Sequence, residues 1–238
     1  DPQFRLVAAL ESPQHPLLGS DAGPIAGIPA LGVPVAGSLD VEADVMIDFS
    51  VPAGAMSALD MCLKKRTALV CATTGLDERQ LDRLHQASQR ISVVWAPSMS
   101  LAVNLTMKLA EVAGAALKEH DADVEIIERH HRYKEDSPSG TALKFGQLIA
   151  AVMGQDHHQH GRQGRPGARP RGEIGYHAVR AGDNPGEHTI VFGMIGETVE
   201  LTVRATNRDC YAQGALAAAK YLAGKPAGMY SIRDVLQL

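Results

Sequence analysis

Four short apolar runs among the first hundred residues, each ending in polar residues, constrain the fold of this chain most. They occupy residues 4–11, 45–50, 68–75 and 91–98, and the first of them is expected to be a buried strand. Segments of helical character separate the later runs, and strands that alternate with helices at this spacing predict a parallel sheet covered by helices. Such a sheet binds ligands at the carboxyl ends of its strands. We therefore predict an α/β domain with a ligand site at that edge.

Local signals place helices and polar side chains around these runs. Pro52 stands where the first turn of a helix tolerates proline, and this helix is expected to continue to about Lys65. Asp77 occupies an N-cap position, and Gln80 follows at the position that completes a capping box. The polar residues at the predicted strand ends are Glu11, Ser50, Thr73, Thr74 and Ser98.

The pattern changes in the next part of the chain, where strands and helices no longer alternate regularly. A helix over about 102–118, a strand over 122–131 and a second amphipathic helix are expected first. Residues 154–172 are rich in Gly, His and Arg and are expected to form a long flexible loop. Three strands are then predicted over residues 174–183, 187–193 and 197–205.

These two patterns predict two domains. Residues 102–208 would form an α+β domain with a mixed sheet. Residues 1–101 would form the parallel-sheet domain together with 209–238, where a helix over about 212–222 and a short final segment close the chain. A chain of 238 residues is long enough for each domain to have its own core.

Composition excludes several classes of protein. No apolar run approaches the roughly 20 residues that span a bilayer, and a net charge of −4 gives no general attraction to nucleic acid. Cys62, Cys71 and Cys210 are odd in number and form no CxxC pair, which argues against a disulfide framework or a zinc site and favours a reducing cytoplasm. Residues 1–12 lack a basic signal-peptide region, so the chain is expected to begin inside a fold.

One segment concentrates the residues best suited to chemistry. A predicted strand end carries four potentially cationic side chains: His130, His131, Arg132 and Lys134. The first turn of the next predicted helix contains Ser139, Gly140 and Thr141. The free N–H groups and dipole of a helix start favour an anion, and histidine titrates near neutral pH. The segment is therefore expected to hold a small anionic substrate and to protonate it.

Two other interpretations of this segment remain open at this point. The charges could form a solvated surface patch beside an ordinary helix cap. The histidines could also bind a metal, but neighbouring residues of a strand point to opposite sides and no third ligand stands at regular spacing. We expect no metal.

The whole segment resembles the motif E-x-H-H-x-x-K-x-D-x-P-S-G-T-A of the 4-hydroxy-tetrahydrodipicolinate reductase family, also called the dihydrodipicolinate reductase family. Every fixed position is matched, from Glu128 through Ala142. The similarity also includes residues 17–23, 45–50, 73–75 and 179–188, Arg208 and the terminal RDVL. The resemblance thus covers nearly the entire chain.

The resemblance implies a reductase that uses NADH or NADPH on a cyclic dicarboxylate of the lysine and diaminopimelate pathway. Its first domain would be a Rossmann-like dinucleotide-binding domain, and its second would bind the substrate and assemble a homotetramer through its sheet. His130 matches the family's proton donor and Lys134 its catalytic lysine. The substrate would be held by His131, Ser139, Gly140 and Thr141.

The cofactor half of the site departs from the family pattern. The Gly-rich turn expected about 20 residues before Glu11 is absent, so residues 4–11 match the family's second strand and the first strand is missing from this chain. Glu11 matches the acidic residue at the adenosine ribose. Ser12 stands where some members have an arginine suited to a 2′-phosphate, which favours NADH. The other implied cofactor contacts are Ala72, Thr73, Thr74, Ala96, Pro97, Ser98 and Met99.

The altered cofactor residues also leave an alternative function open. A homologue could keep the substrate pocket, lose cofactor chemistry and act as a binding or regulatory protein. A different NAD(P)-linked dehydrogenase would explain the parallel half but not the motif around His130. The histidines without comparable context, expected to be surface or loop residues, are His120, His157, His158, His160 and His177.

Overall fold

The computed structural model describes all 238 residues, and the chain divides into two compact units. The first comprises Asp1–Pro97 and Ala215–Val235, and the second comprises Ser98–Gly214 and Leu236–Leu238. A separate hydrophobic core lies in each unit. None of the helices combines the length and apolar character that crossing a bilayer requires.

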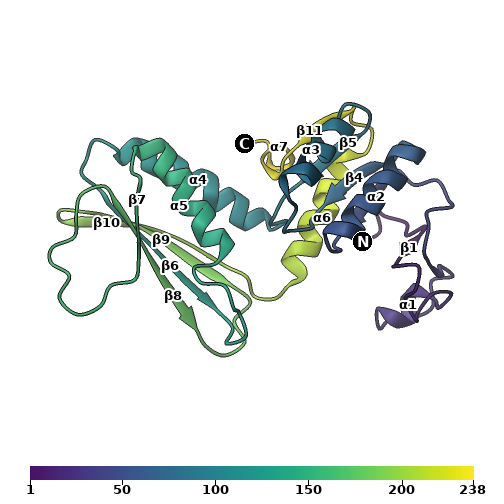
Figure 1. Ribbon diagram of the computed structural model, residues 1–238, viewed down its shortest axis with the longest axis horizontal. Coiled ribbons are helices and arrows are strands. Elements are labelled where there is room, and N and C mark those ends of the chain that lie inside the picture. Colours follow the sequence, from purple (N-terminus) through teal and green to yellow (C-terminus); the bar gives the residue numbers. More distant parts are fainter. The chain divides into compact units, whose positions relative to one another are not determined.

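A four-stranded sheet forms the centre of the first unit (Figure 1). All of its strand pairs are parallel, in the order β11-β5-β4-β3, as the alternating pattern predicted. Strand β4 is buried at every position, which is typical of a parallel strand covered on both faces. The strands are β3 (Val45–Asp48), β4 (Ala68–Cys71), β5 (Ser92–Trp95) and β11 (Gly228–Tyr230).

The helices of this unit begin where the local signals predicted. Helix α2 (Pro52–Lys65) has its proline in the first turn. Helix α3 (Glu78–Ala87) is capped by Asp77, whose carboxylate accepts the backbone N–H of Gln80 at 2.8 Å. The Gln80 side chain in turn accepts the backbone N–H of Asp77 at 3.0 Å, which completes the capping box.

The prediction of a buried strand over residues 4–11 was wrong in length and in burial. Only Ala9–Leu10 form a strand, β1, which pairs with β2 (Val35–Ala36) in a separate two-stranded sheet. Leu6 is 50% exposed. The main sheet ends at β3, so none of its strands pairs with this apolar run. The short helix α1 (Ala22–Ile25) lies between β1 and β2 in the sequence.

A five-stranded mixed sheet and two helices make up most of the second unit (Figure 1). The order is β10-β9-β6-β8-β7, with β9 antiparallel to both neighbours and β8 parallel to both of its own. Helices α4 (Leu101–Leu117) and α5 (Gly140–Met153) pack on one face. The strands are β6 (Asp123–His130), β7 (His157–His160), β8 (Glu173–Arg180), β9 (Glu187–Met194) and β10 (Glu197–Arg204).

Buried and less buried side chains alternate along strand β6, and this alternation continues to its polar end. Val124 and Ile126 are fully buried and share a core cluster with Phe145 of α5. Because side chains alternate across a strand, Glu128 and His130 point to the same buried face as these two residues. The strand period therefore places two ionisable groups at the margin of the core.

The prediction of a long flexible loop over residues 154–172 was wrong for residues 157–160. Strand β7 occupies part of this segment and pairs in parallel with β8 at the edge of the sheet. His158 places Nδ1 2.7 Å from the hydroxyl of Tyr176, and the ring of His160 stacks on the same tyrosine with a centroid distance of 5.1 Å. These long-range contacts order a segment whose composition is typical of a loop.

The end of the chain adds one strand that the sequence did not predict. Helix α6 (Asp209–Leu222) covers the predicted helix and begins slightly earlier. Strand β11 then pairs in parallel with β5 of the first unit. Helix α7 (Ile232–Leu236) contains most of the terminal segment.

Candidate active site

His130 ends strand β6 and is held by the carboxylate two residues before it. Its ring Nδ1 lies 2.5 Å from Oε2 of Glu128, and only 8% of the residue is exposed. The two side chains share a face of the strand, so this hydrogen bond follows directly from the strand period. With Nδ1 bonded to the carboxylate, Nε2 is the ring nitrogen that remains for a ligand.

Glu128 is fully buried, and both of its oxygens accept hydrogen bonds. Arg180 donates to Oε1 and to Oε2, each at 2.7 Å, and the backbone N–H of Ser139 donates to Oε1 at 3.0 Å. Burial by itself raises the pKa of the Glu128 carboxyl, but hydrogen bonds from Arg180, His130 and Ser139 outweigh it and lower the pKa overall. Glu128 is therefore a carboxylate at neutral pH.

Burial also dominates the acidity of His130. It lowers the pKa of the imidazole, the Glu128 carboxylate raises it, and the positive charges of Lys134 and Arg180 lower it further. The net pKa lies below the ordinary value of histidine. A protonated His130 is consequently a stronger acid than a histidine in water.

The start of helix α5 lies beside this pair. Ser139 caps the helix, since its Oγ accepts the backbone N–H of Ala142 at 3.1 Å. Gly140 is exposed, and a Cβ added there would have no atom within 4 Å. Thr141 is half-buried in the same turn. The exposed first turn presents its backbone N–H groups to an anion, and the carboxylate of Asp136 already accepts a hydrogen bond from the N–H of Gly140.

His188 comes from strand β9, where it pairs directly with Glu128 of β6. Its Nε2 lies 3.0 Å from Oγ of Ser139, and its ring meets that of His130 edge-on at 5.2 Å. Burial, followed by the charge of His130, lowers the pKa of His188 to about 4. The ring is neutral near pH 7, and its tautomer decides whether Nε2 or the Ser139 hydroxyl is the donor of this hydrogen bond.

The loop between β6 and α5 carries the predicted catalytic lysine. Nζ of Lys134 donates to Oδ1 of Asp136 at 2.7 Å, and this contact is the main reason that the pKa of Asp136 is lowered. Arg180 holds the same loop by donating to the backbone carbonyl of Asp136 at 2.7 Å. The lysine side chain is 21% exposed, so the ammonium group remains accessible.

His131 begins the same loop and is held there through its backbone. Its N–H donates to the carbonyl of Asn184 at 2.8 Å. The ring Nδ1 is buried and has no hydrogen-bond partner. Buried polar atoms are rarely left unpaired in folded proteins. Because Nδ1 is closed to solvent, a ligand would contact the remaining, half-buried part of His131.

The carboxyl ends of the parallel strands in the first unit gather a second polar cluster. Thr73 is buried and donates its hydroxyl to Oδ2 of Asp48 at 2.6 Å, so this side chain is already engaged. Ser50 donates its hydroxyl to Oδ1 of the same aspartate at 2.5 Å. Thr74 is exposed. Asp48, which sequence reasoning did not single out, therefore fixes the turn that follows β4.

The remaining predicted cofactor residues differ in accessibility. Glu11 and Ser12 are exposed, and the carboxylate of Glu11 accepts the backbone N–H of Ser12 at 2.7 Å. Ala72 is half-buried and Pro97 is exposed, so both leave backbone or ring atoms accessible. Few side-chain atoms are accessible at three other positions, because Ala96 and Met99 are buried and Ser98 is half-buried.

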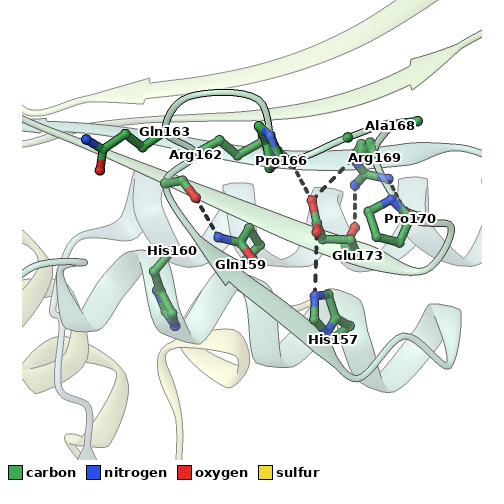
Figure 2. Close-up of a pocket in the computed structure, with 12 residues that line it drawn as sticks. His157, Gln159, His160, Arg162, Gln163, Pro166, Ala168, Arg169, Pro170 and Glu173 are labelled. Carbon is green, nitrogen blue, oxygen red and sulfur yellow. Dashed lines mark hydrogen bonds and ion pairs between the residues drawn. The ribbon is translucent and has the colours of Figure 1, made fainter.

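A cavity of about 650 Å³ lies elsewhere in the second unit, and no predicted site residue lines it (Figure 2). Its wall includes Arg162 and Arg169, which form ion pairs with Glu125 and Glu173. These arginines are already neutralised by carboxylates. His177 also takes part in this cluster, because its Nε2 lies 2.7 Å from Oε2 of Glu125. These ion pairs attach the loop after β7 to strands β6 and β8 of the sheet.

Three functional residues near His130 received no role from the sequence: Glu128, Arg180 and His188. All three lie within segments that match the family pattern. Glu128 had a usable signal, because it stands two residues before His130 on one strand. Arg180 and His188 lie on other strands, and no sequence signal connected them with His130.

Comparison with known proteins gives one consistent result. Two family models match the chain: "Dihydrodipicolinate reductase, N-terminus" over residues 1–99 and "Dihydrodipicolinate reductase, C-terminus" over residues 102–236. The 4-hydroxy-tetrahydrodipicolinate reductase of Rhodopirellula baltica is 54% identical over 99% of this chain and 88% of its own length. The enzyme of the same name from Alkalilimnicola ehrlichii is 48% identical over 98% of this chain and 89% of its own length.

Solved structures show a similar fold. A dipicolinate-bound dihydrodipicolinate reductase from Paenisporosarcina sp. TG-14 superposes with a TM-score of 0.75 at 28% identity. The match covers 95% of this chain and 87% of that one.

Proposed function

Because this chain belongs to the dihydrodipicolinate reductase family, we propose that His130 and Lys134 supply the proton that its reaction consumes. The reaction is the NAD(P)H-dependent reduction of 4-hydroxy-tetrahydrodipicolinate to tetrahydrodipicolinate, a step of lysine and diaminopimelate biosynthesis. The nicotinamide cofactor supplies the hydride when it is bound. Exchange of a hydroxyl group for hydride consumes one proton and releases water, so the enzyme needs a general acid.

The hydrogen bond between His130 and Glu128 is the observation that carries this assignment. The carboxylate fixes the ring through Nδ1, so Nε2 exchanges its proton with the substrate. Burial lowers the pKa of His130, which makes its protonated form a better donor. Lys134, on the loop that follows, attracts the anionic substrate and is a second source of the proton.

The substrate carboxylates would bind at the start of helix α5. Gly140 and Thr141 would contribute backbone N–H groups of an exposed first turn, and the half-buried His131 would contribute its ring. Ser139 acts through its cap, because its hydroxyl is engaged by Ala142 and His188. Cations and helix N–H groups together suit a cyclic dicarboxylate.

The residues of the first unit would hold the cofactor, with a preference for NADH. The exposed carboxylate of Glu11 suits a ribose hydroxyl pair, and Ser12 offers no positive charge to a 2′-phosphate. Thr74 and Pro97 are accessible beside the nicotinamide-binding loops, whereas Ala72, Thr73, Ala96, Ser98 and Met99 would contribute through backbone atoms or packing. The Asp48–Thr73 hydrogen bond supports this by fixing the turn after β4.

Assembly and location complete the proposal. Residues 1–101 with 209–238 would bind the dinucleotide, and residues 102–208 would bind the substrate and form a homotetramer. Helices α4 and α5 cover only one face of the mixed sheet, which supports assembly through the other face (Figure 1). Three free cysteines support a reducing cytoplasm. Light scattering during size-exclusion chromatography tests the tetramer.

The activity is tested by a coupled assay. The upstream synthase supplies the hydroxylated substrate, and oxidation of NADH or NADPH is followed by absorbance. We expect cofactor oxidation that depends on the synthase, its substrates and this protein together. A protein that binds dipicolinate but oxidises neither cofactor would instead be a substrate-binding homologue.

A further inference from the structure

Arg180 connects three parts of the proposed site. It ends strand β8, where it pairs in register with His130 at the end of β6. Its guanidinium donates to both oxygens of Glu128 and to the backbone carbonyl of Asp136, each at 2.7 Å. A planar guanidinium presents its N–H groups in a fixed fork, so these contacts also fix the relative positions of their acceptors.

We propose that Arg180 is a positioning residue. Its guanidinium holds three parts of the site in one arrangement: the general acid His130, the substrate anchor at the start of helix α5 (residues 139–141), and the loop that carries Lys134. This inference rests on the proposed roles of His130 and Lys134. It assigns to Arg180 no contact with the substrate. Its action passes through Glu128 on one side and through the backbone of Asp136 on the other.

The connection to His130 runs through the charge of Glu128. A buried carboxyl without a cation tends to take up a proton. The fork keeps Glu128 ionised, and an ionised carboxylate only accepts hydrogen bonds. Nδ1 of His130 must therefore be the donor, and the proton for the substrate sits on Nε2. The 2.5 Å contact between the two residues depends on this arrangement.

Arg180 is connected to the substrate anchor through Glu128 and to Lys134 through Asp136. Oε1 of Glu128 accepts the backbone N–H of Ser139 at 3.0 Å, so the arginine and the cap of α5 share one carboxylate oxygen. Asp136 accepts Arg180 on its backbone carbonyl and Lys134 on its side chain. One guanidinium thus restrains both ends of the loop that carries the lysine.

Electrostatics give this role a signature that packing alone would not produce. The charged or titratable groups around His130 are Glu128 on its own strand, Arg180 on β8, His188 on β9 and Lys134 on the loop. Loss of the arginine charge by itself would raise the pKa of His130, but it would also let Glu128 take up a proton, and Glu128 raises this pKa more strongly than Arg180 lowers it. Loss of Arg180 and loss of the Glu128 charge are therefore both expected to lower the pKa of His130.

The test compares kcat and the pH dependence of kcat/KM for Arg180→Met, Arg180→Lys and Glu128→Gln. A general acid loses activity above its pKa, so the basic limb reports His130. We expect Arg180→Met to lower kcat about tenfold or more and to move this limb to lower pH, as Glu128→Gln should also do. Arg180→Lys should leave the limb in place but still lower kcat, because it keeps the charge without the fork.

Arg83→Met is the matched control, because Arg83 is paired with Asp60 at 2.5 Å in the first unit. Circular dichroism and thermal melts establish folding, and the lysine variant keeps the test valid if Arg180→Met unfolds. Normal kcat and an unmoved basic limb in the folded Arg180 variants would overturn the positioning role. If His130→Gln and Lys134→Ala are inactive in that case, the proposed function stands and only this inference fails.

Discussion

Gly186 packs against the outer nitrogen of His130. A Cβ added at Gly186 would lie 3.0 Å from Nε2 of the imidazole and 3.3 Å from Cδ2. The glycine also has a φ of +151°, which L-residues rarely adopt. Space beside Nε2 of His130 therefore depends on the absence of a side chain at position 186.

Gly186→Ala is expected to lower both stability and turnover. The backbone strain should reduce the free energy of unfolding by about 1–3 kcal/mol, and the new methyl group should displace the ring of His130. Urea unfolding and kcat measure the two effects. Gly196→Ala is the control, since Gly196 has a φ of +89° but an added Cβ would have no atom within 4 Å. Equal kcat in the two variants would contradict the steric part of the prediction.

His130→Gln should lower kcat by about a hundredfold or more, because glutamine can bond Glu128 but cannot donate a titratable proton. The fold should remain, since glutamine is also polar and of similar length. Stopped-flow oxidation of the cofactor gives kcat, and far-ultraviolet circular dichroism checks the fold. His120→Gln, at an exposed position, should behave as the unaltered protein. Near-normal turnover in His130→Gln would remove His130 from the proposed role.

Lys134→Ala should raise KM for the substrate and lower kcat. It removes a positive charge close to the anchor and leaves Asp136 without its ion-pair partner. A loss of about tenfold or more in kcat/KM is expected. Lys144→Ala, on an exposed position of α5, controls for the general loss of a lysine. The lysine has no catalytic or binding role if both variants have the same kcat/KM.

Ser12→Arg should shift cofactor preference toward NADPH. A guanidinium next to Glu11 would provide the cation that a 2′-phosphate requires. The free energy of one hydrogen bond to a charged group corresponds to a change of about tenfold in the ratio of kcat/KM for the two cofactors. The unaltered protein should prefer NADH. Ser12→Gln supplies similar length without the charge and should change little. A strong NADPH preference in the unaltered protein would refute the proposed cofactor choice.

His188 should make stability depend on pH. Its pKa is lowered to about 4 in the folded chain from an ordinary value of 6.5, so between these values the unfolded chain binds a proton that the folded chain does not. The free energy of unfolding should therefore fall as pH is lowered through this window, by roughly 3 kcal/mol in total for this group. Urea unfolding at several pH values measures the slope. His188→Gln should show a shallower slope, and an unchanged slope would count against a neutral buried His188.

Local sequence signals predicted much of the fold. The capping box at Asp77, the proline start of α2 and the strand that leads into His130 each depend on residues close together in the chain, and the structure contains all three. Burial of residues 4–11 and the order of residues 157–160 were predicted wrongly. Both depend on which strand pairs with which, and apolar content or loop composition does not determine that.

By itself, the sequence determined the family, the reaction and the identity of the candidate acid. A contiguous motif around His130 is visible without coordinates, and the acid and helix start follow from neighbouring residues. Only the tertiary structure decided how that acid is held. Arg180 and Glu128 are 52 positions apart, and Ser139 and His188 are 49 apart. Such pairs meet because of the order of strands in the mixed sheet, and strand order is set by packing over the whole domain rather than by local sequence.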